Sequence, residues 1–158
     1  MPCTWCVASP NLRANPQAHF RDGGCTVKIT LHRVQCHAKT ESGEDDIYCV
    51  ARTADAQQRE LARVGVGRFD IGRDVHPEKL IWQGTDALVV TVRFMESDAG
   101  EPGHGADDFI GEITISRDGT CRPGHCTLDE GFDQDRRFRQ FSMTGSAANY
   151  IVQLQIQA

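Results

Sequence analysis

Residues 88–95 read Leu-Val-Val-Thr-Val-Arg-Phe-Met and carry the clearest structural signal in the chain. The apolar side chains of Val90, Val92 and Phe94 alternate with polar ones, which is the period-two pattern of a β-strand with one buried face. The segment therefore predicts a strand that places one face in a hydrophobic core.

The same kind of signal recurs on both sides of this segment. Four further short strands are predicted, and turns rich in Gly and Asp separate them; they lie at 27–31, 48–51, 109–115 and 150–156. Several short strands spaced in this way, without a strong helical period between them, are typical of a β-sandwich. The predicted fold class is therefore an all-β sandwich.

Two stretches are less regular. Residues 55–63 fit about two turns of helix, but they equally fit the mouth of a hairpin whose second strand is 63–71, and Gly65 and Gly67 would end a helix there. Residues 121–139 are rich in Gly, Asp and Arg and predict a long loop.

The length of 158 residues is typical of a single domain. Three prolines interrupt the first part of the chain, where no apolar period is sustained. We therefore expect an irregular N-terminal segment at 1–24 and a sandwich domain at 25–158.

Composition excludes several classes of partner. The net charge is −5, with 14 Arg and only 3 Lys, so the basic surface of a nonspecific nucleic-acid-binding protein is not expected. No apolar run approaches the roughly 20 residues that span a bilayer, so no transmembrane segment is predicted. No secretory signal is visible, which favours a cytoplasmic location, with peripheral membrane association as the alternative.

The seven cysteines are odd in number, and we expect mainly free thiols in a reducing compartment. Two alternatives remain. Cys3 and Cys6 together with Cys121 and Cys126 can supply four thiolates to zinc, with His125 as an alternate ligand. A disulfide between two of these cysteines is the other alternative.

Acidic residues are concentrated in two segments, 41–46 and 96–108, which hold nine of the 22 carboxylates. Both segments also contain glycine, which lets a loop fold back so that several oxygens converge. Converging carboxylates repel one another unless a cation lies between them, and Ca²⁺ accepts six to eight oxygen ligands in irregular geometry. The simpler interpretation is that the loops are acidic for solubility.

The order of residues in these segments carries a resemblance. Residues 43–50 read Gly-Glu-Asp-Asp-Ile-Tyr-Cys-Val, 92–98 read Val-Arg-Phe-Met-Glu-Ser-Asp, and 107–113 read Asp-Asp-Phe-Ile-Gly-Glu-Ile. These stretches are similar to the calcium loops of C2 domains. The resemblance implies an antiparallel, eight-stranded Greek-key sandwich. It also implies metal ligands at Asp46, Glu96, Asp98 and Asp108, with Asp107 and Glu41 beside ligand positions.

The family commonly uses Ca²⁺ to dock on anionic phospholipid, and many members bind proteins without metal. Thr40 stands where the family has a further Asp, and Glu96 replaces an Asp, so one weakly bound Ca²⁺ is expected. The prediction is a non-enzymatic module that binds an anionic membrane or a protein. Its alternatives are a metal-independent interaction or structural protein, and a hydrolase that uses the loop carboxylates.

Overall fold

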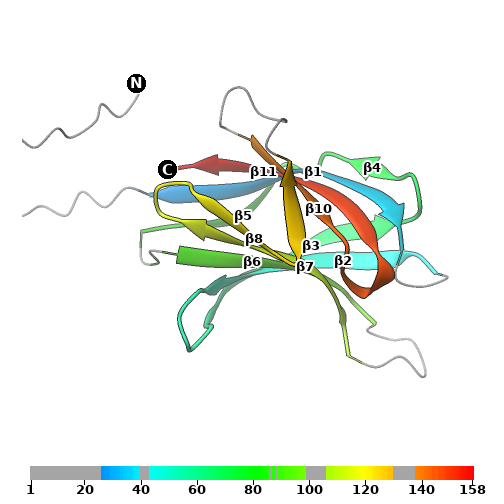
Figure 1. Ribbon diagram of the computed structural model, residues 1–158, viewed down its shortest axis with the longest axis horizontal. Coiled ribbons are helices and arrows are strands. Elements are labelled where there is room, and N and C mark those ends of the chain that lie inside the picture. The colour runs from blue at the N-terminus through cyan, green and yellow to red at the C-terminus, as the bar shows by residue number, and fades with distance from the viewer. Residues whose placement is uncertain (1–25, 40–42, 86, 88, 99–105, 130–137) are drawn as a thin grey trace, which may run out of the picture.

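The computed structural model describes residues 26–39, 43–85, 87, 89–98, 106–129 and 138–158. They form two antiparallel sheets, seen as two layers in Figure 1. The first contains β4 (Asp74–Val75), β1 (Val27–Ala38), β11 (Asn149–Gln157), β10 (Phe138–Met143) and β9 (Cys126–Asp129) in that order, with β5 (Lys79–Gly84) also paired to β1. The second has the order β3 (Glu60–Phe69), β2 (Asp45–Thr53), β6 (Val89–Glu96), β7 (Asp108–Ser116) and β8 (Cys121–Gly124).

The predicted all-β sandwich is confirmed, and the five predicted strands correspond to β1, β2, β6, β7 and β11. The alternation in β6 also has the expected phase, because Val90, Val92 and Phe94 are all buried between the sheets. The eight-stranded Greek-key order implied by the C2 resemblance stays a prediction. The N-terminal segment 1–24 lies outside the described residues.

The hairpin alternative for residues 55–63 is correct and the helical one is wrong. Asp55 starts the turn, since its Oδ1 accepts hydrogen bonds from the backbone N–H groups of Gln57 (3.1 Å) and Gln58 (3.0 Å). The same bonds would also cap the start of a helix, but Gln58 has a φ of 46°, which a right-handed helix does not allow, so the chain turns back instead. The chain then returns as β3, antiparallel to β2.

The long loop predicted at 121–139 is wrong over most of its described part. Residues Cys121–Gly124 pair with β7 in the second sheet, and Cys126–Asp129 pair with β10 in the first. His125, with a φ of 55°, lies where the chain passes from one sheet to the other. Backbone pairing at a sheet edge does not require apolar alternation, so these residues carry no strand pattern in their sequence.

The strand β1 extends beyond the predicted 27–31 because an irregularity in its register changes which side chains face inward. Between Leu31 and Arg33 the pairing with β11 shifts by one residue. Val27, Ile29 and Leu31 are buried before the shift, and Val34 and Cys36 are buried after it. A β-bulge of this kind lets one long strand keep a continuous apolar face although its sequence changes phase.

Apolar side chains from both sheets fill the space between them. Phe94 from the second sheet and Phe141, Tyr150 and Leu154 from the first are each at most 1% exposed. Within the described ranges, no helix is long and apolar enough to cross a membrane.

Candidate functional site

Three acidic strand ends lie side by side at one end of the second sheet. In the cross-strand register, Ile47 of β2 lies opposite Glu96 of β6, and Glu96 lies opposite Asp108 of β7. The backbone N–H of Ser97 also donates a 3.0 Å hydrogen bond to the carbonyl oxygen of Asp46. The two acidic segments, 50 residues apart in the chain, are therefore neighbours in space.

The carboxylates at this end do not all face the same way. Glu96 shares the inner face with Ile47, which lies opposite it, and is 1% exposed. Asp46 precedes Ile47 on β2 and therefore projects from the outer face, where it is exposed. The strand geometry thus separates two side chains that the C2 resemblance implies as ligands of one ion.

The other predicted ligands differ in how far their side chains are buried. Asp98 and Asp108 are partly buried, and Asp107 is exposed and accepts a hydrogen bond from the Tyr48 hydroxyl. Burial and the bond to Asp107 both raise the pKa of Tyr48, so this phenol stays a proton donor. Glu41 lies outside the described residues. Within the described part of the chain, no three His, Cys, Asp or Glu side chains are grouped so that they could hold a metal ion.

Sequence reasoning missed the most buried carboxylate at this end, Asp45. It is 0% exposed, and the Tyr150 hydroxyl of the opposite sheet donates a 2.6 Å hydrogen bond to its Oδ2. Burial, together with the bond to Asp45, raises the pKa of Tyr150. The alternation from Asp45 through Ile47 to Cys49 is the signal that places Asp45 inside, because all three are buried.

A fixed positive charge lies close to these carboxylates. The ammonium of Lys39, just after β1, is 2.7 Å from Asp70 Oδ1 and donates a 2.6 Å hydrogen bond to the carbonyl oxygen of Gly43. The hydrogen bond to Asp70 raises the pKa of Lys39, so the ammonium stays charged. Lys39 thereby joins the ends of β1 and β3 to the chain that enters β2, and it offsets part of the negative charge there.

The cysteines do not form a thiolate site among the described residues. Cys36, Cys49, Cys121 and Cys126 are free thiols, whereas Cys3 and Cys6 lie outside the described residues. Burial raises the pKa of both Cys121 and Cys126 to about 11. These two thiols therefore stay protonated near neutral pH, which does not favour nucleophilic chemistry.

No protein-family model and no curated protein matches this chain.

Proposed function

We propose that this protein is a non-enzymatic, C2-like binding module. In this proposal its acidic end takes up one Ca²⁺ weakly, and the ion's open coordination positions engage the phosphate oxygens of an anionic phospholipid surface. Ca²⁺ suits such a site because it accepts many oxygen ligands in irregular geometry.

One observation carries the proposal. The register that aligns Ile47, Glu96 and Asp108 brings the ends of β2, β6 and β7 to one end of a single sheet, and the ligands that the C2 resemblance implies lie on these strand ends or just beyond them. Like charges gathered in this way repel one another, and a bound cation removes that repulsion. The split of Asp46 and Glu96 between two faces agrees with weak rather than tight binding.

Calorimetric titration with Ca²⁺ tests the proposal, using Asp98→Asn/Asp108→Asn as the site variant. The control is Glu60→Gln/Asp118→Asn, which removes the same charge. Glu60 lies opposite Arg52 in the pairing of β2 and β3, at the far end of β2, and Asp118 follows the far end of β7. We expect a dissociation constant of about 10⁻⁴–10⁻³ M for the wild type and the control. The site variant should bind at least tenfold more weakly.

Vesicle sedimentation then tests the partner. Phosphatidylserine vesicles should retain the wild-type protein in 1 mM Ca²⁺ but not in chelator, and phosphatidylcholine vesicles should not retain it. If no Ca²⁺ binding is measured, or if the site variant binds like the control, the metal-dependent proposal is wrong.

A specific observation favours one alternative, a metal-independent interaction module on the same fold. Protein groups already compensate several carboxylates at this end: Tyr150 bonds Asp45, Tyr48 bonds Asp107, and Lys39 pairs with Asp70. Carboxylates that already have hydrogen-bond or ion-pair partners within the protein do not require a bound ion for stability. A calorimetric titration without heat and without a Ca²⁺-dependent change in thermal stability would favour this alternative.

A further inference from the structure

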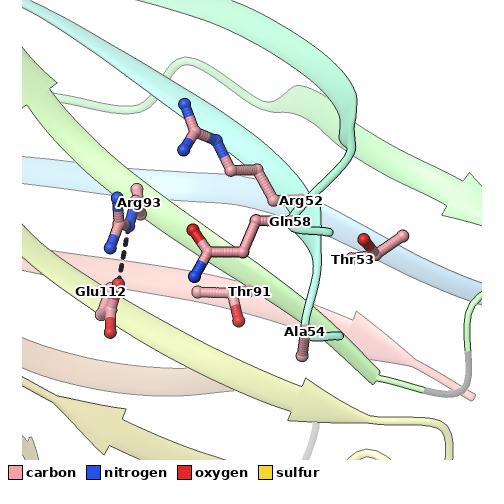
Figure 2. Close-up of a pocket in the computed structure, with 7 residues that line it drawn as sticks. All are labelled: Arg52, Thr53, Ala54, Gln58, Thr91, Arg93 and Glu112. Carbon is pink, nitrogen blue, oxygen red and sulfur yellow. Dashed lines mark hydrogen bonds and ion pairs between the residues drawn. The ribbon is translucent and has the colours of Figure 1, made fainter. Parts of the chain in front are cut away.

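A small polar cavity lies on the outer face of the second sheet, far from the acidic end. Its volume is about 90 Å³, and it is located where β2 turns into β3 (Figure 2). The walls come from β2, β6, β7 and the β2–β3 turn, and the lining residues are Arg52, Thr53, Ala54, Gln58, Thr91, Arg93 and Glu112. Arg52 and Thr91 lie opposite each other in the β2–β6 register, so their side chains share this face.

The residues that line the cavity carry one net positive charge. Arg93 and Glu112 form an ion pair with 2.7 Å between Nε and Oε2, which Figure 2 shows as a dashed line. The Arg93 guanidinium also lies over the ring of Phe109, 5.6 Å from its centroid. Arg93 is thus held and neutralised by its neighbours, whereas Arg52 brings a second guanidinium to the cavity.

The Arg52 side chain has an unused donor. Its Nε is buried and has no hydrogen-bond partner within the part of the chain that the structure describes. A buried N–H without a partner costs roughly 1–3 kcal/mol. A guanidinium donates most strongly to an oxyanion, because the hydrogen bonds are then assisted by charge. The Nε itself is closed to solvent, so a ligand in the cavity would be bound through the terminal amino groups of Arg52, and an anion is the ligand that suits them.

Two neutral polar groups stand beside Arg52. Gln58 is held in the turn at a φ of 46°, and its backbone N–H donates to Asp55 Oδ1 at 3.0 Å. Figure 2 shows its carboxamide between Arg52 and Thr91. The Thr91 hydroxyl lies 3.3 Å from that of Thr114, so it can donate its proton to a ligand while it accepts from Thr114. An oxyanion in the cavity would have several donors.

A larger, mostly apolar hollow continues from the cavity. Its volume is about 580 Å³, and Thr53 and Ala54 line both spaces. The remaining walls are Asp55, Arg59, Ala87, Val89 and Thr114. Asp55 and Arg59 bring opposite charges, and the Asp55 carboxylate already accepts hydrogen bonds from the turn. The two spaces adjoin at Thr53 and Ala54, and together they are called the groove, with Arg52 at one end and the mostly apolar hollow at the other.

We propose that this groove binds a small organic carboxylate with an unbranched apolar chain. The carboxylate would lie at Arg52 and Gln58, and the chain would extend past Ala54 and Val89. The single net positive charge matches a monoanion, whereas the neighbouring Glu112 carboxylate would repel a phosphate dianion. This inference is independent of the Ca²⁺ proposal, because none of the groove residues belongs to the acidic end.

Hexanoate is the test ligand, titrated by calorimetry and by two-dimensional amide NMR, with butanoate, inorganic phosphate and hexylamine as comparisons. Hexanoate should shift the amide signals of Ala54, Thr91 and Thr114. It should bind on the order of tenfold more tightly than butanoate, because two more methylenes leave water. Phosphate and hexylamine should bind more weakly than hexanoate.

Arg52→Gln should lower the affinity for hexanoate at least tenfold, and Arg52→Lys should restore part of it. Arg63→Gln is the matched control, since Arg63 lies on the neighbouring strand and is paired with Glu60 at 3.2 Å outside the groove. It should bind hexanoate like the wild type. Thermal melting of each variant establishes that it is folded.

Several results would overturn the proposal. These are tighter binding of phosphate than of hexanoate, equal affinity for butanoate and hexanoate, and unchanged binding in folded Arg52→Gln. Equal losses in the Arg52→Gln and Arg63→Gln variants would also overturn it, since they would indicate a general charge effect. So would the lack of any binding at 10 mM hexanoate.

Discussion

The hydroxyl of Tyr150 donates a 2.6 Å hydrogen bond to the carboxylate of Asp45, and the two residues belong to opposite sheets of the sandwich. Both side chains are buried, and the Phe69 ring packs edge-on against Tyr150 with 5.8 Å between centroids. A polar bond between two sheets that meet mainly through apolar side chains helps to fix their relative position at this end, because hydrogen bonds are directional.

Removing this bond should destabilise the fold. Tyr150→Phe leaves the ring in place but removes the donor to a buried carboxylate, and we expect a loss of about 1.5–3 kcal/mol in the free energy of unfolding. Urea denaturation measures this loss. A double-mutant cycle with Asp45→Asn should give a coupling energy above about 0.5 kcal/mol. Tyr48→Phe, at the exposed bond to Asp107, should change stability by no more than about 0.5 kcal/mol. Additive effects of Tyr150→Phe and Asp45→Asn would contradict the assignment.

The protein should lose stability in alkaline solution. Burial raises the pKa of Cys49 from 9.0 to about 12, and burial also raises the pKa of Tyr150 above its usual 10.0. These groups hold their protons in the folded state while the unfolded chain releases them. Their contribution is complete below about pH 9 and is lost as the pH rises toward the folded values.

Denaturation curves between pH 8 and pH 11 measure this dependence. Cys49→Ala should lower stability at every pH, because it leaves a cavity, but its free energy of unfolding should fall less steeply above pH 9. Each titrating group contributes at most about 1.4 kcal/mol per pH unit. A Cys49→Ala curve parallel to that of the wild type would show that this thiol does not contribute.

Acid should weaken the contact between β1 and β4. Arg33 Nε donates a 2.9 Å hydrogen bond to Asp74 Oδ1, and this bond lowers the pKa of Asp74. A lowered folded pKa stabilises the protein above the unfolded value of 3.8, and the contribution is lost as the pH falls through the folded value. Asp74→Asn should therefore show a smaller loss of stability between pH 5 and pH 2. If the melting temperature of Asp74→Asn falls between pH 5 and pH 2 as steeply as that of the wild type, Asp74 makes no such contribution.

Gly145 should not tolerate a side chain. A Cβ atom there would lie 2.4 Å from the carbonyl oxygen of Phe109 and 2.5 Å from that of Ile110, and backbone atoms cannot move away easily. We expect Gly145→Ala to cost about 1–3 kcal/mol, as overpacking does in other interiors. Gly65→Ala is the control, since nothing lies within 4 Å of its Cβ position. It should be neutral or slightly stabilising in urea denaturation, and equal losses in both variants would contradict the close approach.

The sequence determined part of the acidic end, namely that its two acidic segments lie together. Carboxylates at 41–46 and 96–108 predicted a shared location, and the structure places Asp46, Glu96 and Asp108 on neighbouring strands. Sequence reasoning chose Asp46 as a ligand and passed over Asp45. The two differ only in the phase of the strand, and the structure buries Asp45 and exposes Asp46.

The groove on the outer face had no sequence signal. Arg52 and Arg93 are 41 positions apart, and neither belongs to a recognisable motif. Gln58 joins them only because the hydrogen bonds of Asp55 close a turn where the sequence allowed a helix as well. Sites assembled from separate strands depend on register, which is set by turns and by core packing over the whole sheet.

By itself, the sequence determined the fold class, because alternation of apolar and polar residues is a local property of each strand and burial selects its apolar face. Val90, Val92 and Phe94 are an example, because these alternate residues of β6 are all buried. Only the tertiary structure decided which adjacent carboxylate faces inward, how Tyr150 meets Asp45, and where the chain changes sheets at His125. Those outcomes require contacts between distant segments, and a one-residue change of register would turn each side chain to the other face.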